Sequence, residues 1–219
     1  MIYLTSDHHF MHSKIIEYCN RPFKNYQEMD RVLIENYNSV VSKDDTVFIL
    51  GDFTMSNNRE VIEKYCSQLN GNKHLILGNH DRAKAFTYID CGFLSVHTSF
   101  PLDEYNLLMV HDPSDSDAAK SMGYDKILCG HVHGLFKFKN NVLNIGIDQF
   151  DYTPISLETA LSHFCHFIPE VKENRDVHTE HCCVFHGCKY NDNDCPVENR
   201  IKRQSYPCEQ CEEHLKKCK

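Results

Sequence analysis

The chain begins with short apolar runs that alternate with segments of helical periodicity. A strand that is covered on both faces carries apolar residues at every position. Short apolar runs bounded by turn residues therefore predict buried strands. These runs span residues 2–5, 46–50 and 75–77. Apolar residues three and four positions apart predict amphipathic helices. The helical segments span residues 13–18, 26–41 and 60–69, and Pro22 breaks the first of them.

The second half of the chain is richer in strands. Its apolar runs span residues 94–96, 105–110, 126–129, 135–138 and 142–145. Residues 139–141 read Lys-Asn-Asn and predict a hairpin turn between the last two runs. An amphipathic helix is expected at residues 156–164. Alternating strands and helices followed by a strand-rich half predict an α/β protein in which two sheets pack face to face, with helices outside.

The composition changes at about residue 169, where apolar residues thin out and Cys, His, Asn and charged residues dominate. We therefore expect a main domain at residues 1–168 and a small appendage at residues 169–219, a division that the chain length allows. No apolar run is long enough to span a membrane, and residues 1–7 lack the basic and apolar regions of a signal peptide. A cytoplasmic location is expected.

Polar residues that can bind metal follow five of the apolar runs, at strand ends where open α/β sheets commonly place their sites. In order they read Asp7-His8-His9, Gly51-Asp52, Gly78-Asn79-His80-Asp81, Val110-His111-Asp112 and Gly130-His131-Val132-His133. In extended chain, residues two apart project to the same side. The pair Asp7 and His9 and the pair His131 and His133 can therefore each clasp one ion.

The ligand types of these five loops narrow the choice of metal. Two carboxylates, an amide and four imidazoles form a mixed oxygen and nitrogen set. Such a set suits Mn²⁺, Fe²⁺, Zn²⁺ or Ni²⁺ better than Ca²⁺, which prefers oxygen alone. The ligands are too many for one tetrahedral site, so two ions that share a bridging carboxylate are expected. Ion pairs of this kind lie roughly 3.5–4 Å apart and clamp the attacking and leaving oxygens of a phosphoryl displacement.

The ordered set resembles the calcineurin-like metallophosphoesterase superfamily, whose pattern is Asp-x-His, Gly-Asp, Gly-Asn-His-Asp/Glu, His and Gly-His-x-His. The match includes all five blocks and covers residues 1 to about 160. The resemblance implies a four-layer αββα sandwich. For the first ion it implies the ligands Asp7, His9, Asp52 and His133. For the second ion it implies Asp52, Asn79, His111 and His131, with Asp52 as the bridge.

The resemblance also implies a mechanism, in which a metal-bridging hydroxide attacks phosphorus. His80 would then face the scissile phosphate as general acid for the leaving oxygen, or as a cation that stabilises charge, and Asp81 would orient it. Protein Ser/Thr phosphatases of the superfamily carry Asp-Arg-Gly after the second block and Glu after Asn-His, and this chain has neither. Short insertions and the lack of a basic capping domain argue against a processive DNA-repair nuclease. We expect a small phosphoester substrate, with a phosphodiester favoured over a phosphomonoester.

Two basic residues near the first loop are candidates for substrate contact. His12 and Arg21 lie in a segment that resembles a subgroup with a basic residue near the cleft. Arg21 could contact phosphate through two parallel hydrogen bonds. The alternative for Arg21 is a surface residue before a proline turn. His8, His74 and His97 are interpreted as structural or solvated.

The 12 cysteines fall into two sets. Five are scattered and are expected to pack as small buried hydrophobic residues: Cys19, Cys66, Cys91, Cys129 and Cys165. Seven lie within residues 182–218, where a reducing compartment favours metal binding over disulfides. The pair Cys208 and Cys211 has the two-residue spacing of a structural zinc site, and Cys188 and Cys195 could complete a tetrahedral set.

The assignment of these zinc ligands stays open, because His186 or Cys183 could replace one member of the set. An oxidised or disordered tail is the alternative to a segment that zinc stabilises. The segment resembles cysteine-rich tails that follow phosphoesterase domains in some phage-type proteins.

A binding module is the main alternative to an enzyme, with the tail recognising nucleic acid or protein and catalysis secondary. The net charge of −8 disfavours nonspecific attraction of nucleic acid, and residues 169–219 carry nine Lys or Arg against ten Asp or Glu. A metal-bound scaffold without catalysis is a third hypothesis, and the presence of His80 argues against it.

Overall fold

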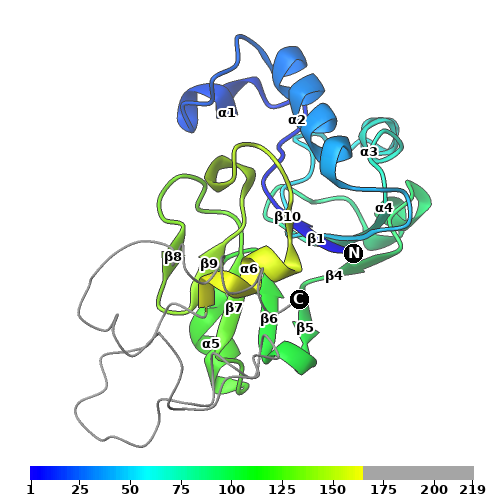
Figure 1. The fold of residues 1–219 in the computed structure, drawn as a ribbon. Helices are drawn as coiled ribbons and strands as arrows, with labels where there is room; N and C mark the ends of the chain where they lie inside the picture. Colours follow the sequence, from blue (N-terminus) through cyan, green and yellow to red (C-terminus); the bar gives the residue numbers. More distant parts are fainter. Residues whose placement is uncertain (165–219) are drawn as a thin grey trace, which may run out of the picture. The chain divides into compact units, whose positions relative to one another are not determined.

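The computed structural model describes residues 1–164 of the chain (Figure 1). The predicted zinc ligands Cys188, Cys195, Cys208 and Cys211 lie outside the described residues, as does the expected domain boundary at residue 168. Both therefore stay predictions. No helix within residues 1–164 is long and apolar enough to cross a membrane.

The first sheet has five strands in the order β10-β1-β2-β3-β4. Strands β1 to β4 run parallel, and β10 pairs antiparallel with β1. The strands span Ile2–Thr5 (β1), Thr46–Ile49 (β2), Asn72–Ile76 (β3), Ser95–His97 (β4) and Ile155–Ser156 (β10). Because β1, β2 and β3 are parallel neighbours, the loops that follow them leave the sheet at the same edge.

The second sheet has the order β5-β6-β7-β9-β8. Its central strands β6, β7 and β9 run parallel, and β5 and β8 pair antiparallel at the edges. The strands span Ser99–Leu102 (β5), Leu107–Val110 (β6), Lys126–Cys129 (β7), Phe138–Lys139 (β8) and Val142–Asn144 (β9). The predicted hairpin joins β8 to β9 through Asn140 and Asn141, whose φ angles of 53° and 60° are those of the primed turn that a two-residue hairpin favours.

Among residues 1–164, five helices lie outside the sheets, as the sequence predicts, whereas the helix expected at residues 156–164 contributes to the core between them. Four helices pack on the first sheet: α1 (Ser13–Tyr18), α2 (Tyr26–Val40), α3 (Arg59–Cys66) and α4 (Ala85–Asp90). Helix α5 (Ser116–Ser121) packs on the outer face of the second sheet, and α6 (Leu157–Phe164) contributes to the core between the sheets. Three short 3-10 turns complete the described elements: η1 (Asp103–Tyr105), η2 (Pro113–Asp115) and η3 (Ile147–Gln149).

Alternate residues of each central strand point into different cores, which explains the uninterrupted apolar runs. In β2, Val47 and Ile49 pack against the helices, whereas Phe48 packs against the second sheet. In β7, Leu128 faces the first sheet, whereas Ile127 faces the layer of α5. Figure 1 shows α2 and α3 on one side of β1 and strands β5 to β9 on the other. The predicted four-layer αββα sandwich is confirmed.

Several boundaries differ from the sequence prediction for physical reasons. The predicted strand at 105–110 begins only at Leu107, because η1 ends in Asn106 with a left-handed φ of 49°. The predicted strand at 135–138 keeps only Phe138, since Leu135 is 79% exposed and its N–H donates to Val132 in a turn. Edge strand β5 was not predicted, because Pro101 argues against a strand unless it lies at a sheet edge.

Candidate metal centre

The five polar loops converge at the carboxyl ends of β1, β2, β3, β6 and β7. Their backbone is unusual, because five of the predicted ligands have left-handed φ angles. The values are 62° at Asp7, 51° at His9, 54° at Asp52, 69° at His131 and 45° at His133. An extended backbone, from which the sequence argument derived the pairing, is therefore wrong at these positions. Left-handed non-glycine residues cost roughly 1–3 kcal/mol each and cluster at functional sites.

Asp7, His9 and His133 form a first ligand group, with one ligand atom from each within 4.8 Å of the others. The Nε2 atom of His9 is buried and has no hydrogen-bond partner within residues 1–164. A buried polar atom left unpaired is costly. A cation bound among these three side chains would satisfy it, so this group fits a metal ion.

Asn79, His111 and His131 form a second ligand group, and a ligand atom of Asp52 lies within 4.8 Å of both histidines. The Oδ1 atom of Asn79 is 3.1 Å from Nε2 of His111 and 2.9 Å from Nδ1 of His131. Nδ1 of His111 donates to the carbonyl of Leu50 at 2.7 Å, so that Nε2 is the ring nitrogen that faces Asn79 and Asp52. An amide oxygen, a carboxylate and two imidazole rings gathered in this way form a mixed oxygen and nitrogen set that fits a divalent cation.

Asp52 is shared by the two groups. Its Oδ2 lies 3.4 Å from Nε2 of His9 and 3.5 Å from Nε2 of His111. Burial of Asp52 raises its pKa, but the hydrogen bond and charge of His111 outweigh burial, so that this pKa lies below its ordinary value. One ionised carboxylate thus reaches both groups, as a bridging ligand must.

Asp81 lies beneath this bridge and is only 5% exposed. Its Oδ2 accepts hydrogen bonds from the N–H groups of Asp52 at 2.7 Å and Gly78 at 2.9 Å, and its Oδ1 accepts from Phe53 at 3.1 Å. The sequence predicts that Asp81 orients His80. The structure instead joins the Asp81 carboxylate to the backbone around Asp52, so Asp81 positions the loop that presents Asp52.

Two glycines let the ligand loops approach closely. A Cβ atom at Gly78 would collide with Oδ1 of Asp52, and one at Gly130 would lie 2.6 Å from Oδ2 of Asp7. The Asp7 oxygens also accept from the N–H of His131 at 2.9 and 3.1 Å. The first and the last of the five loops are therefore joined directly.

Arg21 has a different role from the phosphate contact that the sequence suggests. It is buried, and its guanidinium donates to both oxygens of Asp148 at 2.8 Å. It also donates to the carbonyl of Asp7 at 2.8 Å and to that of His8 at 3.2 Å. With these partners, Arg21 holds the first loop in place and is not directed at a substrate. The alternative, a surface residue, is also wrong.

Asp148 is a site residue that the sequence reasoning missed. Its Oδ2 accepts from Nδ1 of His133 at 2.8 Å, which directs Nε2 of His133 towards the first ligand group. Burial raises the pKa of Asp148, but His133 and Arg21 outweigh it and lower the pKa to about 2. The sequence contains a pattern that could have identified Asp148, because Gly146-Ile147-Asp148 follows an apolar run as the other five loops do.

His80 and His12 lie next to the first ligand group. The His80 ring is centred 5.2 Å from the His9 ring, and its backbone N–H donates to Oδ1 of Asp52 at 2.9 Å. The His12 ring lies 5.3 Å from His9 and 6.1 Å from His80. Cys19 is half-buried and packs against the apolar core of the first sheet, and its sulfur also lies within 4.8 Å of ligand atoms of His133 and Asp148.

Comparisons with known proteins agree with this geometry. A family model described as the calcineurin-like phosphoesterase superfamily domain matches residues 1–147. An uncharacterized protein of Methanocaldococcus jannaschii is 35% identical over 170 residues, covering 72% of this chain and 87% of that protein. The gene 66 protein of Mycobacterium phage D29 is 39% identical over 158 residues, covering 60% of this chain and 78% of that protein.

A solved structure is also similar. It is the crystal structure of a protein of unknown function from Aquifex aeolicus, with a TM-score of 0.60 and 25% sequence identity. The similarity covers 75% of this chain and 98% of the Aquifex chain. It therefore extends over almost the whole of that protein.

Proposed function

Because the chain belongs to the calcineurin-like phosphoesterase superfamily, we propose that it is a two-metal phosphodiesterase. Membership itself implies metal-dependent phosphoester hydrolysis. The observation that carries the finer proposal is the convergence of two ligand groups on one shared carboxylate, Asp52. A shared carboxylate is the arrangement that holds two ions close together.

In this proposal, the first ion takes Asp7, His9, Asp52 and His133, and the second takes Asp52, Asn79, His111 and His131. The mixed oxygen and nitrogen ligands suit Mn²⁺, Fe²⁺, Ni²⁺ or Zn²⁺. Divalent ions bound there supply a Lewis acid that activates water and neutralises the charge that develops on the phosphoryl oxygens.

His80 is the proposed proton donor to the leaving oxygen. It lies close to Asp52 and His9, and it lines a cavity that opens beside these residues. The hydrogen bond from its backbone N–H to Asp52 fixes the start of this loop against the bridging carboxylate. General acids in this position contribute typically 10²- to 10⁴-fold to the rate. Asp81 acts on His80 only through the loop that both share.

The charges around the cavity favour a diester over a monoester. A monoester dianion is commonly bound by an Arg side chain through two parallel hydrogen bonds. Lys14 is the one Lys or Arg among the described residues that line this cavity, and Arg21 is occupied by Asp148. A diester carries a single negative charge, so fewer positively charged side chains are needed to bind it.

Metal analysis and hydrolysis of a chromogenic diester test the proposal together. Protein purified without chelator should bind about two divalent ions and release p-nitrophenol from bis-p-nitrophenyl phosphate faster than from p-nitrophenyl phosphate when Mn²⁺ is present. Asp52→Ala should lose both the ions and the rate. Asp117→Ala, whose side chain is 96% exposed, is the matched control and should retain both. An unchanged rate in Asp52→Ala would reject the assignment.

A further inference from the structure

A cavity of about 800 Å³ opens beside the metal centre. His9, His80 and His133 line the end that faces the ligand groups. Cavities of roughly 300–1,000 Å³ hold drug-sized ligands. The cavity therefore has room for a large organic group attached to the phosphate.

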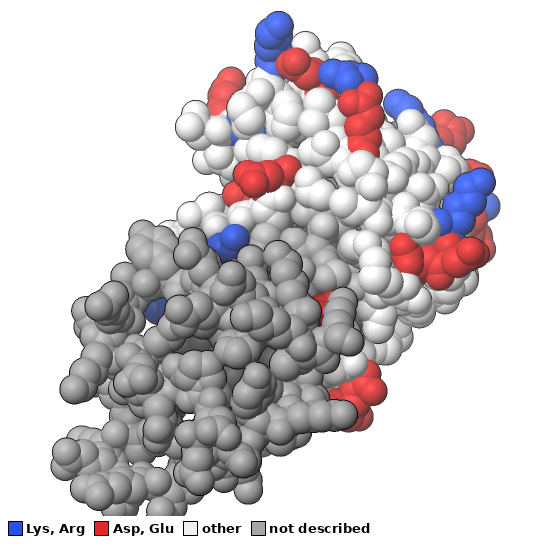
Figure 2. Space-filling model, viewed as in Figure 1, with Lys and Arg blue, Asp and Glu red and all other residues white. Residues whose placement is uncertain are grey.

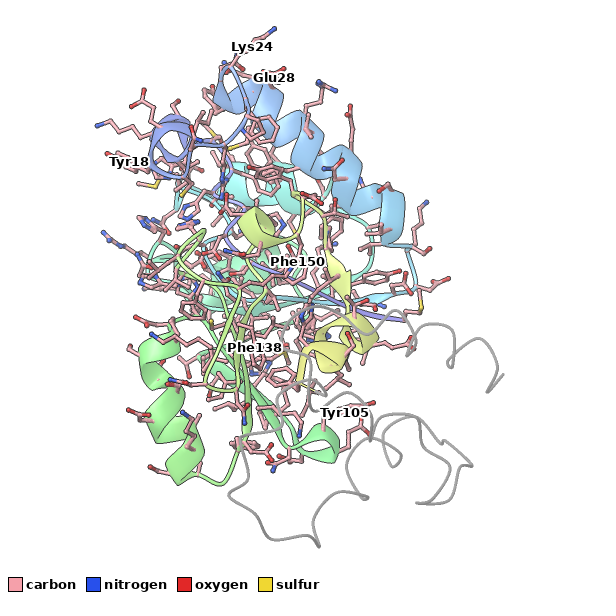
Figure 3. The ribbon with its side chains drawn as sticks, turned by 60° about the vertical axis from the view of Figure 1, so that its left-hand side comes forward. Tyr18, Lys24, Glu28, Tyr105, Phe138 and Phe150 are labelled. Carbon is pink, nitrogen blue, oxygen red and sulfur yellow. The ribbon has the colours of Figure 1, made fainter. Side chains whose placement is uncertain are left out.

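Aromatic rings lead from the metal centre to the mouth of this cavity. The His12 ring adjoins both His9 and His80, and the Tyr18 ring lies 6.4 Å beyond His12 at an angle of 84°. Tyr18 is 69% exposed at the end of α1, where Figure 3 labels it. An exposed ring at a cavity mouth presents a face on which a planar group can stack.

Two further exposed apolar side chains of the wall come from loops. Met55 and Leu135, 41% and 79% exposed, line the same cavity as Tyr18. Met side chains adapt their shape and make favourable contacts with aromatic rings. Three of the large hydrophobic side chains that are exposed within residues 1–164 thus surround one cavity, and a planar ligand would cover them.

Polar groups interrupt this apolar wall. Helix α1 stops before Asn20, which has a left-handed φ of 50°, and Asn20 and Lys14 both line the cavity. An alkyl chain would desolvate these polar groups without pairing them, which is costly. A heteroaromatic ring with carbonyl and amino substituents offers them hydrogen bonds as well as a face for stacking.

From these features we propose that the cavity binds a nucleoside, so that the substrate is a phosphodiester of a small nucleotide. The proposal rests on the proposed phosphodiesterase function and names its substrate class. Hydrolysis adds water across one P–O bond and gives a monoester and a free hydroxyl, so no other reactant is required.

The charges on the chain favour a small nucleotide over a long nucleic acid. The net charge of −8 repels a polyanion, and Lys14 is the one Lys or Arg on the described cavity wall. On the face shown in Figure 2, Lys and Arg are interspersed with Asp and Glu. A long strand would need a continuous basic surface along its backbone.

A matched pair of substrates tests the proposal on the full chain with Mn²⁺. Uridine 2′,3′-cyclic phosphate and glycerol 1,2-cyclic phosphate share a five-membered cyclic diester and differ in the nucleoside. We expect the KM of the nucleotide to be about tenfold lower, in line with base stacking on an aromatic side chain. Tyr18→Ala should remove most of this difference, and Tyr18→Phe should keep it. Phe86→Ala, an exposed ring on α4 outside the cavity, is the matched control.

Binding of uridine 3′-monophosphate, followed by ligand-observed NMR, provides a readout that does not need turnover. Wild-type protein should bind it and Tyr18→Ala should bind at least about fivefold more weakly. Equal KM values for the two cyclic diesters, or a preference for an octyl ether of the glycerol compound, would overturn the nucleoside assignment. Failure to hydrolyse bis-p-nitrophenyl phosphate would instead reject the proposed function, and the NMR comparison would still decide whether the cavity binds a nucleoside.

Discussion

The two ligand groups of the candidate metal centre differ in how deeply their side chains are buried and in which residues hold those side chains in place. Asp7 and His9 of the first group are almost fully buried, whereas in the second group Asn79 is exposed and the His131 side chain is 37% exposed. In the first group, His133 is held by Asp148 and, through it, by the buried Arg21. The second group has the Leu50 carbonyl behind His111. For the proposed two-ion site, the difference predicts that an ion in the first group is held more tightly and exchanges more slowly than one in the second.

Removal of metal should show this difference most strongly. Dialysis against a chelator is expected to release the ions in two stages, the exposed second group first, because water and chelator reach it directly. Activity should vanish with the first stage, while about one ion per chain remains. Atomic emission analysis of samples taken over time, alongside the rate on a diester, measures both. Simultaneous loss of both ions would mean that the two groups do not differ.

Asp148→Asn should weaken the metal affinity of the first ligand group alone. The carboxylate that fixes the Nδ1–H of His133 is lost, and such outer partners are worth about 10- to 100-fold in metal affinity. Isothermal titration of metal-free protein with Mn²⁺ should show one weakened site and one unchanged site.

Two further variants complete this comparison. Asn79→Ala should show the reverse pattern, with only the second site weakened. Asp125→Asn changes an exposed carboxylate away from the centre and should match the wild type. If Asp148→Asn weakened both sites equally, Asp148 would be a general stabilising residue and not a support for His133.

A smaller effect is expected at Asp30, which supports the loop after His9. Its carboxylate accepts from the Met11 N–H and from the Tyr65 hydroxyl, and burial raises its pKa to about 6. The folded state therefore binds this proton more tightly than the unfolded state, and the contribution of Asp30 to stability falls as the pH rises from about 4 to about 6. The loss is about 3 kcal/mol, because the pKa of Asp30 lies about two units above its ordinary value.

Denaturant unfolding of wild type and Asp30→Asn at pH 4, 5, 6 and 7 measures this effect. The free energy of unfolding of the wild type should decrease relative to that of Asp30→Asn over this range. Asp44→Asn, an exposed acidic residue, serves as the control. A difference that is constant with pH would show that Asp30 has an ordinary pKa.

Much of the fold was predictable because buried strands leave a strong pattern. The run at residues 126–129 corresponds to β7 without error, since Ile127, Leu128 and Cys129 alternate between two apolar cores. Strand β5 and the short helices α4 and α5 were not predicted. Their patterns are too short to be distinguished from loops, and the edge position of β5 is set by pairing with β6 rather than by its own residues.

The seven proposed metal ligands could be located from the ends of the predicted strands. The residues that hold these ligands in place could not be predicted in this way. Asp148 is 127 residues from Arg21, and no local pattern reports that the two side chains meet. The role of Asp81 was likewise hidden, because its partners are backbone N–H groups that every residue type offers. The local sequence indicates which loops carry polar side chains. Which of these side chains bond to one another depends on residues that lie far apart in the chain.

The left-handed backbone at Asp7, His9, Asp52, His131 and His133 has a consequence for how the protein acquires its ions. These conformations are set by the surrounding sheets and loops, so the ligands already point inward once the chain has folded. We therefore predict that the chain folds without metal and takes up its ions afterwards. One preparation, folded in the absence of metal, could be charged afterwards with manganese, iron, nickel or zinc in turn and compared without refolding.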